Sequence, residues 1–228
     1  MIYDFIPVSF IDYPGKIAAT VFVSGCNFRC PYCHNSSLIS VREGICDEAD
    51  IFKYLKNRKG RIDGVCITGG EPTLWKGLKN FTERVKALDL CVKLDTNGSR
   101  AEKLKELINE DLLDYIAMDI KAPLNKYGLF SNNESDISNV KLSVEIIKNS
   151  GKGYEFRTTV NEKILHIEDF ISISKWLSPA KRYVLQGYKY NDDVLDKKLC
   201  GTKPCEIEFL EGIKKMFESN IEEVLIRV

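Results

Sequence analysis

Short apolar segments alternate along this chain with longer segments whose apolar residues recur at helical spacing. The apolar segments are rich in Val, Ile and aromatic residues, as in strands that are covered on both faces. The predicted strands are Ile17–Ser24, Gly64–Thr68, Cys91–Asp95, Tyr115–Lys121, Tyr154–Val160 and Arg182–Gln186. The predicted helices are Asp47–Arg58, Leu74–Leu88, Arg100–Asn109, Ile137–Asn149 and Ile167–Leu177. This alternation predicts an α/β fold on a mostly parallel sheet with helical crossovers.

The length of the chain decides how such a sheet can close. A full eight-stranded barrel typically needs about 250 residues, and this chain has 228. We therefore predict an open, partial (β/α)6 TIM-like barrel, with a doubly wound open sheet as the alternative. In both folds the functional residues gather at the carboxyl ends of the strands.

No linker divides the chain, so we expect one domain. It comprises an N-terminal extension (1–16), a core (17–190) and a C-terminal extension (191–228). Within the C-terminal extension we predict a helix near Glu206–Ser219, and the apolar tail Val224–Val228 can add a strand.

The charge balance narrows the classes of function. Lys plus Arg and Asp plus Glu each total 33, so the formal net charge is zero. A protein that binds nucleic acid non-specifically usually carries a basic excess. The longest uncharged stretch, Ile17–Phe28, is shorter than the roughly 20 apolar residues of a membrane helix. Asp4 and Asp12 argue against a signal peptide. We expect a cytoplasmic protein without a direct nucleic-acid or membrane partner.

Three of the eight cysteines lie close together directly after the first predicted strand, at Cys26, Cys30 and Cys33. Thiolates at this spacing can converge on one metal centre. A tetrahedral zinc site needs a fourth ligand, which His34 or Cys46 can supply. An iron–sulfur cube held by three cysteines instead leaves one iron open for another ligand. The cysteine count alone leaves both interpretations open.

Polar residues follow several later strands. The glycines of Gly69-Gly70-Glu71 let a ligand approach the backbone closely, and Glu71 adds a negative charge there. Asp95 can accept hydrogen bonds from two ribose hydroxyls. Arg157 stands in an apolar strand and needs an anionic partner, either a bound ligand or an acid such as Glu155.

The C-x3-C-x2-C spacing, with Tyr32 before the last cysteine and Gly-Gly-Glu after the second strand, resembles the radical S-adenosylmethionine (SAM) superfamily. The resemblance implies a [4Fe–4S] cluster whose open iron chelates the amino and carboxylate groups of SAM. Reduction of this cluster cleaves SAM to methionine and a 5′-deoxyadenosyl radical. The resemblance implies cluster ligands at Cys26, Cys30 and Cys33, and SAM contacts at Tyr32, Gly69, Gly70, Glu71, Asp95, Lys121 and Arg157.

Two of these contacts have a specific role in the resemblance. Glu71 is expected at the SAM ammonium and Lys121 at the SAM carboxylate, although an ion pair with a neighbouring acid is the alternative for Lys121. The resemblance also implies a monovalent cation at Asp95, Thr96 and Asp119.

Within the superfamily, the chain resembles the activating enzymes of glycyl-radical enzymes, in particular those for anaerobic ribonucleoside-triphosphate reductase. The segments that carry this resemblance are Ser9–Gly15, Gly25–Asn35, Leu94–Gly98 and Met118–Lys121. The implied reaction abstracts a hydrogen atom from a backbone glycine of this large partner. The implied electron donor is an external flavodoxin or ferredoxin, because only Cys46 lies between the cysteine cluster and the Gly-Gly-Glu turn.

Other functions remain open at this point. The same cofactor residues suit an activase of another glycyl-radical enzyme, such as pyruvate formate-lyase, or a radical SAM enzyme acting on a small molecule, peptide or tRNA. A non-catalytic zinc protein is the alternative from a different class. Cys200 and Cys205 are unassigned, and we favour an incidental role because two ligands alone make no metal site. The aromatic residues of Phe10–Tyr13 and Tyr188–Tyr190 are candidates for docking the partner.

Overall fold

The computed structural model describes residues 1–228 and contains a single eight-stranded sheet whose strands pair in sequence order. The strands are β1 (Ile2–Ser9), β2 (Ala18–Val23), β3 (Gly64–Gly69), β4 (Cys91–Thr96), β5 (Tyr115–Asp119), β6 (Gly153–Val160), β7 (Ala180–Gly187) and β8 (Ile221–Arg227). Strands β1 and β2 are antiparallel, and every later neighbouring pair is parallel. The sheet is open, with β1 and β8 at its two edges.

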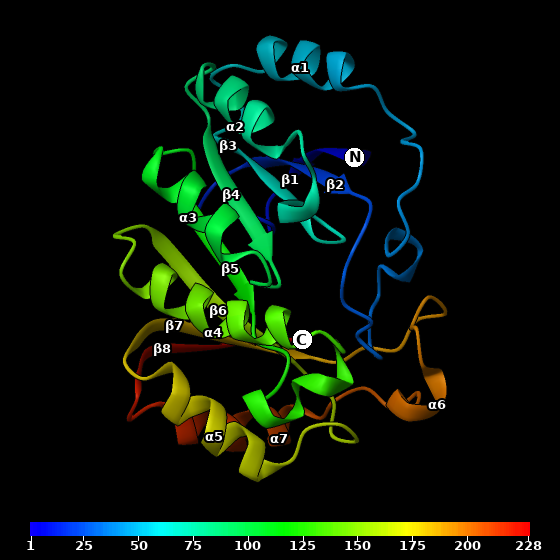
Figure 1. The fold of residues 1–228 in the computed structure, drawn as a ribbon, viewed down its shortest axis with the longest axis vertical. Helices are drawn as coiled ribbons and strands as arrows, with labels where there is room; N and C mark the ends of the chain where they lie inside the picture. Colours follow the sequence, from blue (N-terminus) through cyan, green and yellow to red (C-terminus); the bar gives the residue numbers. More distant parts are fainter.

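Helices wrap around the outside of this sheet (Figure 1). They are α1 (Glu48–Asn57), α2 (Leu78–Lys86), α3 (Ala101–Asn109), α4 (Glu134–Lys148), α5 (Ile167–Leu177), α6 (Lys197–Cys200) and α7 (Ile207–Phe217). Short 3-10 helices span Ser36–Leu38, Pro72–Leu74 and Leu124–Leu129. The units from β2–α1 to β7–α7 confirm the predicted open, mostly parallel (β/α)6 arrangement.

The N-terminal extension contains strand β1, which we did not predict. Its residues alternate poorly, because Asp4 and Pro7 interrupt the apolar run. At the edge of the sheet only part of the strand needs to be covered: Ile2 is buried, whereas Ile6 and Val8 stay exposed. At the other edge, β8 begins before the predicted apolar tail and pairs in parallel with β7.

Two helices begin three or more residues from their predicted starts, and local capping explains both differences. Helix α2 starts after Gly77, because Pro72–Leu74 form a separate 3-10 turn that the Glu71 side chain caps. Helix α4 starts at Glu134, because the side chain of Asn133 accepts a hydrogen bond from the Ser135 N–H. None of the helices combines the length and apolar character that crossing a bilayer requires.

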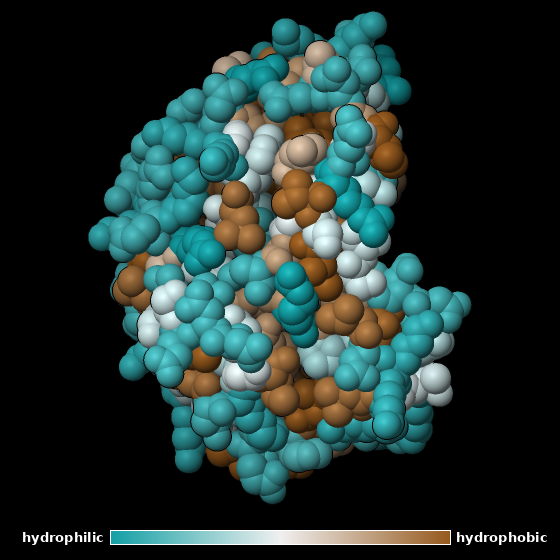
Figure 2. Space-filling view, turned by 45° about the vertical axis from the view of Figure 1, so that its right-hand side comes forward, coloured by the Kyte–Doolittle hydropathy of each residue, from teal (hydrophilic) through white to brown (hydrophobic).

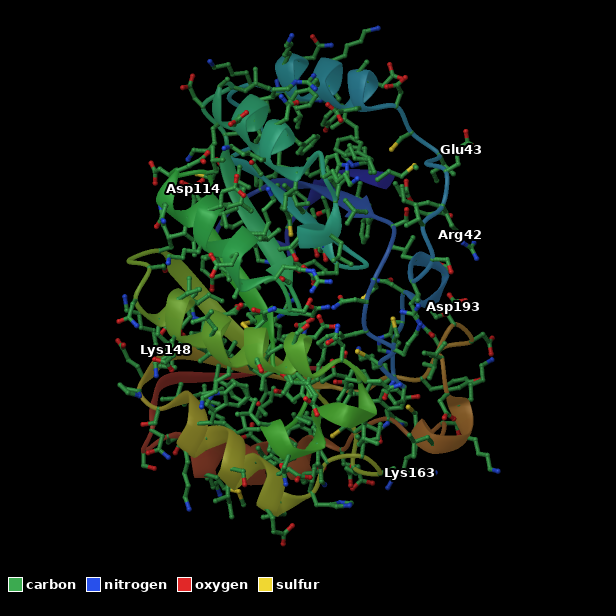
Figure 3. The ribbon with its side chains drawn as sticks, viewed as in Figure 1. Arg42, Glu43, Asp114, Lys148, Lys163 and Asp193 are labelled. Atoms are coloured by element: carbon green, nitrogen blue, oxygen red, sulfur yellow. The ribbon has the colours of Figure 1, made fainter.

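The helices and the sheet share one apolar core of 51 buried residues. Parallel strands place all their carboxyl ends on one side of this core, and Figure 3 makes that side visible. The labelled residues in segments that follow strands lie on the right of Figure 3: Arg42, Glu43, Lys163 and Asp193. The labelled residues in segments that precede strands lie on the left: Asp114 and Lys148. Figure 2 shows a hollowed face with apolar residues along its middle and a polar rim.

An ion pair ties strand β6 to the edge strand β8. The two terminal nitrogens of Arg227, Nη1 and Nη2, donate to the Glu155 carboxylate at 2.9 and 2.8 Å, and Glu155 is fully buried. We expect Arg227→Ala to lower the free energy of unfolding by about 3 kcal/mol, because it leaves a buried carboxylate without its partner. Urea unfolding of the two proteins measures this difference.

The matched control is Arg182→Ala. Arg182 on β7 pairs with Glu223 on the same edge strand, β8, but the Glu223 side chain is 45% exposed. An exposed pair contributes only about 0–1 kcal/mol. Equal losses of unfolding free energy in the two variants would show that burial of Glu155 does not strengthen its ion pair.

Candidate functional site

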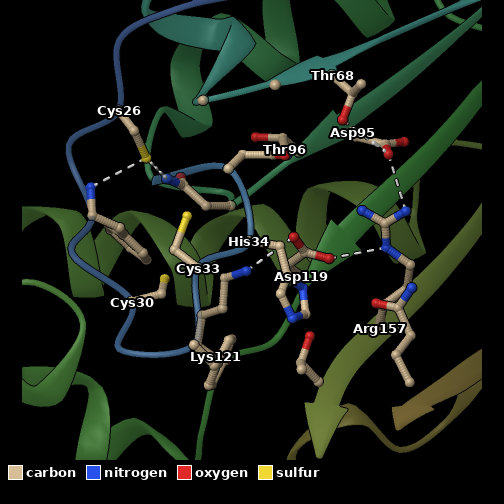
Figure 4. A pocket seen from close by; sticks show the side chains of 18 residues that line it. Cys26, Cys30, Cys33, His34, Thr68, Asp95, Thr96, Asp119, Lys121 and Arg157 are labelled. Carbon is tan, nitrogen blue, oxygen red and sulfur yellow. Dashed lines mark hydrogen bonds and ion pairs between the residues drawn. The ribbon is translucent and has the colours of Figure 1, made fainter. Parts of the chain in front are cut away.

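A cavity of about 250 Å3 opens at the carboxyl ends of β3 to β7, beside the loop that follows β2. Figure 4 shows the side chains that converge on it from these separate elements. The predicted site residues that line this cavity are Cys26, Cys30, Tyr32, Cys33, Gly69, Gly70, Asp95, Lys121 and Arg157. The fold therefore brings together nearly all of the predicted set, and Glu71 is the exception.

The loop that carries the cysteines is held in place by main-chain hydrogen bonds. The N–H of Gly25 donates to the Leu38 carbonyl at 2.8 Å, and the N–H of Glu71 donates to the Gly25 carbonyl at 2.8 Å. This contact requires glycine at position 70, because a Cβ there would lie 2.3 Å from the Gly25 oxygen. The paired glycines thus let the β3 turn approach the cysteine loop, as close backbone packing requires.

Asn27 is a positioning residue that the sequence analysis did not identify. Its side-chain amide donates to Ser99 at 2.9 Å and to the buried carboxylate of Asp136 at 2.8 Å. Its amide oxygen accepts from the Asn97 side chain at 3.1 Å. A single asparagine in a loop carries no signal in the sequence for such contacts, which join residues far apart in the chain.

All three cysteine thiols face one side of the cavity (Figure 4). Burial raises the pKa of Cys26 to about 11 and that of Cys30 to about 12, and it raises the pKa of Cys33 as well. Such thiols stay protonated at neutral pH until a metal displaces the proton. No group of three or more His, Cys, Asp or Glu side chains is gathered closely enough to hold one metal ion.

Five charged residues alternate in sign across the interior of the barrel, and we call them the charged row. In order of contact they are Lys93, Asp95, Arg157, Asp119 and Lys121. Arg157 bridges the two carboxylates, at 3.0 Å to Asp95 and 2.9 Å to Asp119. Lys121 donates to the other oxygen of Asp119 at 3.0 Å. The row has three cations and two anions, so it carries one excess positive charge.

Within the chain, Arg157 forms its ion pairs with members of the charged row. Glu155, the acid that the sequence suggested, pairs with Arg227 instead. The acids that hold Arg157 are Asp95 and Asp119, on β4 and β5. Strand register explains this choice, because Asp119 lies directly opposite Arg157 in the parallel β5–β6 pair.

The row also determines the charge state of its acids. Burial alone would raise the pKa of Asp119, but the charges of Arg157 and Lys121 outweigh it and lower the pKa to about 2. For Asp95, burial opposes the effect of Arg157 and Lys93, and the pKa is again lowered. Both acids are therefore ionised at neutral pH. Arg157 supplies the positive charge at the place where the resemblance implied a monovalent cation.

Glu71 lies away from the cavity surface and serves the local structure. Its carboxylate accepts hydrogen bonds from Thr73, from the Thr96 hydroxyl at 2.7 Å and from the Asn97 N–H at 2.6 Å. Burial raises the pKa of Glu71, and these hydrogen bonds oppose the rise. The sequence could not reveal this, because a motif does not show to which side a side chain turns.

The segment after β7 holds the cysteine loop from outside. The Asp196 N–H donates to the Pro31 carbonyl at 2.9 Å. The His34 ring forms a hydrogen bond with the Lys189 carbonyl and stacks on Tyr188. Tyr188 therefore contacts His34, which lines the cavity, but Tyr188 itself is buried. Phe10, by contrast, lies at the opposite end of the barrel, because Ser9 pairs with Ala18 at the start of β2.

Cys200 and Cys205 line a separate cavity of about 210 Å3, next to Glu162 and Lys163. Burial raises the pKa of Cys200 to about 11 and that of Cys205 to about 12. Both are free thiols, and they play no part in the site around Cys26.

The lowered pKa of Asp119 gives the folded protein an acid sensitivity. A carboxyl whose pKa is about 2 when folded, against a usual 3.8, adds about 2 kcal/mol of stability that is complete above pH 5 and is lost as the pH falls toward 2. We expect Asp119→Asn to flatten the decline of the unfolding free energy between pH 5 and pH 2, measured by urea unfolding across that range.

Exposed Asp193 supplies the control, because Asp193→Asn changes no charged contact. Its pH profile should match that of the natural protein. An Asp119→Asn profile as steep as the natural one would mean that the charged row does not control this carboxyl.

Comparisons with known proteins agree with this geometry. The Radical SAM superfamily model matches residues 20–172. A Methanocaldococcus jannaschii protein described as a "putative glycyl-radical enzyme activating enzyme" is 33% identical over 97% of this chain and 94% of its own length. The pyruvate formate-lyase-activating enzyme of Listeria monocytogenes is 32% identical over 49% of this chain and 49% of its own length. The anaerobic ribonucleoside-triphosphate reductase-activating protein of Escherichia coli is 26% identical over 53% of this chain and 88% of its own length.

Among solved structures, Streptococcus suis SuiB bound to S-adenosylmethionine superposes with a TM-score of 0.68 at 13% identity. The match covers 90% of this chain but only 49% of SuiB, so this chain spans about half the length of that protein. At this identity the likeness establishes the fold. The family match over most of the barrel, together with the likeness to an activating enzyme over nearly the whole chain, shows that the chain belongs to the radical SAM superfamily, in its glycyl-radical enzyme activating group.

Proposed function

We propose that this protein activates anaerobic ribonucleoside-triphosphate reductase by generating a glycyl radical on it. The observation that carries the proposal is a cavity lined both by three free thiols and by four members of the charged row, Asp95, Arg157, Asp119 and Lys121. Full-length likeness to an activating enzyme supports the protein-substrate class. Likeness to the E. coli reductase activator, across most of that protein's length, supports this particular partner.

The residues fit the cofactors that the family implies. Three cysteines provide three of the four ligands of a [4Fe–4S] cluster and leave one iron for SAM. Reductive cleavage of SAM at such a cluster supplies the 5′-deoxyadenosyl radical that removes a hydrogen atom. In our proposal Cys26, Cys30 and Cys33 hold the cluster, and a flavodoxin or ferredoxin delivers the electron.

The chain's own groups then bind and orient SAM. Lys121 ends the charged row next to the cysteine loop and keeps donor N–H groups for a carboxylate, since only one contact, to Asp119, is committed. Gly69 and Gly70 line the cavity beside the same loop, where their backbone atoms can contact a ligand. Asp95 is already bound by Lys93, Thr68 and Arg157, so ribose hydroxyls would have to share it.

An activase for pyruvate formate-lyase is the second candidate, because the enzyme from Listeria monocytogenes matches half of this chain at 32% identity. The two candidates use the same cofactors and differ only in the partner. Mixing experiments with both partners therefore separate them.

The proposal predicts a radical on the partner. We expect the anaerobically reconstituted protein, with SAM, a strong reductant and anaerobic ribonucleotide reductase, to produce a glycyl-radical doublet in the electron paramagnetic resonance spectrum. Cys30→Ala should abolish both the doublet and the cluster absorbance. Cys46→Ala is the matched control, because Cys46 lies outside the cavity and should be dispensable.

Each result has a definite meaning. If SAM is cleaved and the doublet forms on pyruvate formate-lyase but not on the reductase, pyruvate formate-lyase is the partner and the reductase is not. Cleavage without a doublet on either would exclude both and indicate another substrate. A cluster that survives Cys30→Ala would refute the assigned ligands.

A further inference from the structure

Lys93 is the only lysine of the chain that is buried, and 2% of its side chain is exposed. It lies on β4 and does not line the cavity, whereas Asp95, two residues later on the same strand, does. The Lys93 ammonium donates to the Asp95 carboxylate and lies 3.6 Å from the sulfur of Cys66 on the neighbouring strand β3. Lys93 therefore holds Asp95 from within the barrel, as a positioning residue and not as a ligand contact.

The charge on this buried lysine needs an explanation, because a buried ammonium is costly without an anion beside it. Burial alone would lower the pKa of Lys93, but the charge of Asp95 outweighs this effect and raises the pKa, so Lys93 is charged at neutral pH. Asp95 already has another cation, since Arg157 donates to it at 3.0 Å. Without Lys93, the charged row would hold two cations and two anions. Lys93 is thus the source of its excess positive charge.

A soluble monovalent cation, which the resemblance implied at Asp95, Thr96 and Asp119, does not fit these side chains. Each of the four oxygens of the two acids accepts a hydrogen bond from a cation of the charged row, namely Lys93, Arg157 or Lys121. The Thr96 hydroxyl donates to Glu71 instead. A further cation would raise the excess from one to two positive charges in a buried space of low dielectric, which is unfavourable.

We propose that the Lys93 ammonium takes the place of a soluble monovalent cation beside Asp95, so that this protein binds SAM without sodium or potassium. The proposal rests on the SAM binding of the proposed function and does not depend on the identity of the partner. A tethered ammonium carries the same charge as such an ion but loses no translational freedom when it pairs. Its role is to keep Asp95 ionised and fixed in the cavity wall.

The first test compares Lys93→Met with the natural protein, without cluster, SAM or partner. Methionine replaces most of the lysine stem but lacks the ammonium, so one oxygen of Asp95 becomes open to a small cation. Urea unfolding is measured in potassium chloride and in tetramethylammonium chloride of equal ionic strength, because the second cation is too bulky to approach a carboxylate as closely. We expect potassium at about 0.1 M to raise the folded-to-unfolded ratio of the variant about tenfold, as binding with a Kd of about 10 mM requires. The natural protein should unfold alike in both salts.

Lys86→Met is the matched control. It also removes a lysine from an ion pair, here with Asp114 at 2.8 Å, but both side chains are 29% exposed and lie outside the cavity. Water can replace the lost ammonium there, so potassium should have no more effect than tetramethylammonium. An equal potassium effect in this variant would show a general response to salt and would overturn the role of Lys93.

The second test needs no variant and remains decisive if Lys93→Met does not fold. The natural protein with its reconstituted cluster is dialysed anaerobically against SAM in potassium, sodium or tetramethylammonium chloride. The Kd for SAM should agree within about twofold among the three salts, a free-energy difference below about 0.5 kcal/mol.

Three results would each overturn the proposal: a larger loss of SAM affinity in tetramethylammonium, unfolding of the natural protein that depends on potassium, or a folded Lys93→Met variant that does not respond to potassium. Absence of SAM binding in all three salts would contradict the proposed function instead. The unfolding measurements would still decide the role of Lys93, because they use neither SAM nor the cluster.

Discussion

One guanidinium, that of Arg157, holds the carboxylates of two neighbouring strands together inside the barrel. Without it, Asp95 and Asp119 would be two negative charges facing each other in a buried space, which is strongly unfavourable. With Lys93 and Lys121 at the ends, the row becomes a chain of ion pairs with one positive charge in excess. The carboxyl ends of β4, β5 and β6 are thereby tied together directly beneath the cavity.

The cysteine loop is attached to the surrounding barrel by polar contacts of its own. Asn27 links the loop to Ser99 and Asp136, and the Gly25 carbonyl accepts from the N–H of Glu71. Pro31 is held from the other side by Asp196. Because these bonds are internal to the chain, they position the thiols before a cluster binds. Such preorganisation lowers the cost of assembling the site.

The sequence predicted the fold and the composition of the cavity well, and for a physical reason. Parallel β/α units place strand ends on one side, so motifs at Cys26, Gly69, Asp95 and Lys121 had to converge. What the sequence did not reveal depended on side-chain direction and on neighbours distant in the chain. The pairing of Arg157 with Asp119 follows from the register of β5 and β6, which no local pattern reveals.

Other features escaped prediction for related reasons. Glu71 turns inward to Thr96 and Asn97, although its motif suggested a ligand contact. Strand β1 was missed because an edge strand needs only partial apolar cover. The sequence made Phe10 a candidate docking residue. The antiparallel pairing of β1 with β2 places it at the end of the barrel away from the cavity.

In the proposed reaction a hydrogen atom passes from a glycine of the reductase to the 5′-deoxyadenosyl radical, and isotope transfer tests this step most directly. The proposed partner, anaerobic ribonucleotide reductase, would be prepared with glycine deuterated at the α-carbon and incubated anaerobically with this protein, SAM and reductant. Mass spectrometry of the 5′-deoxyadenosine should then show one deuterium from the partner. Unlabelled 5′-deoxyadenosine formed alongside a fully deuterated partner would contradict the account.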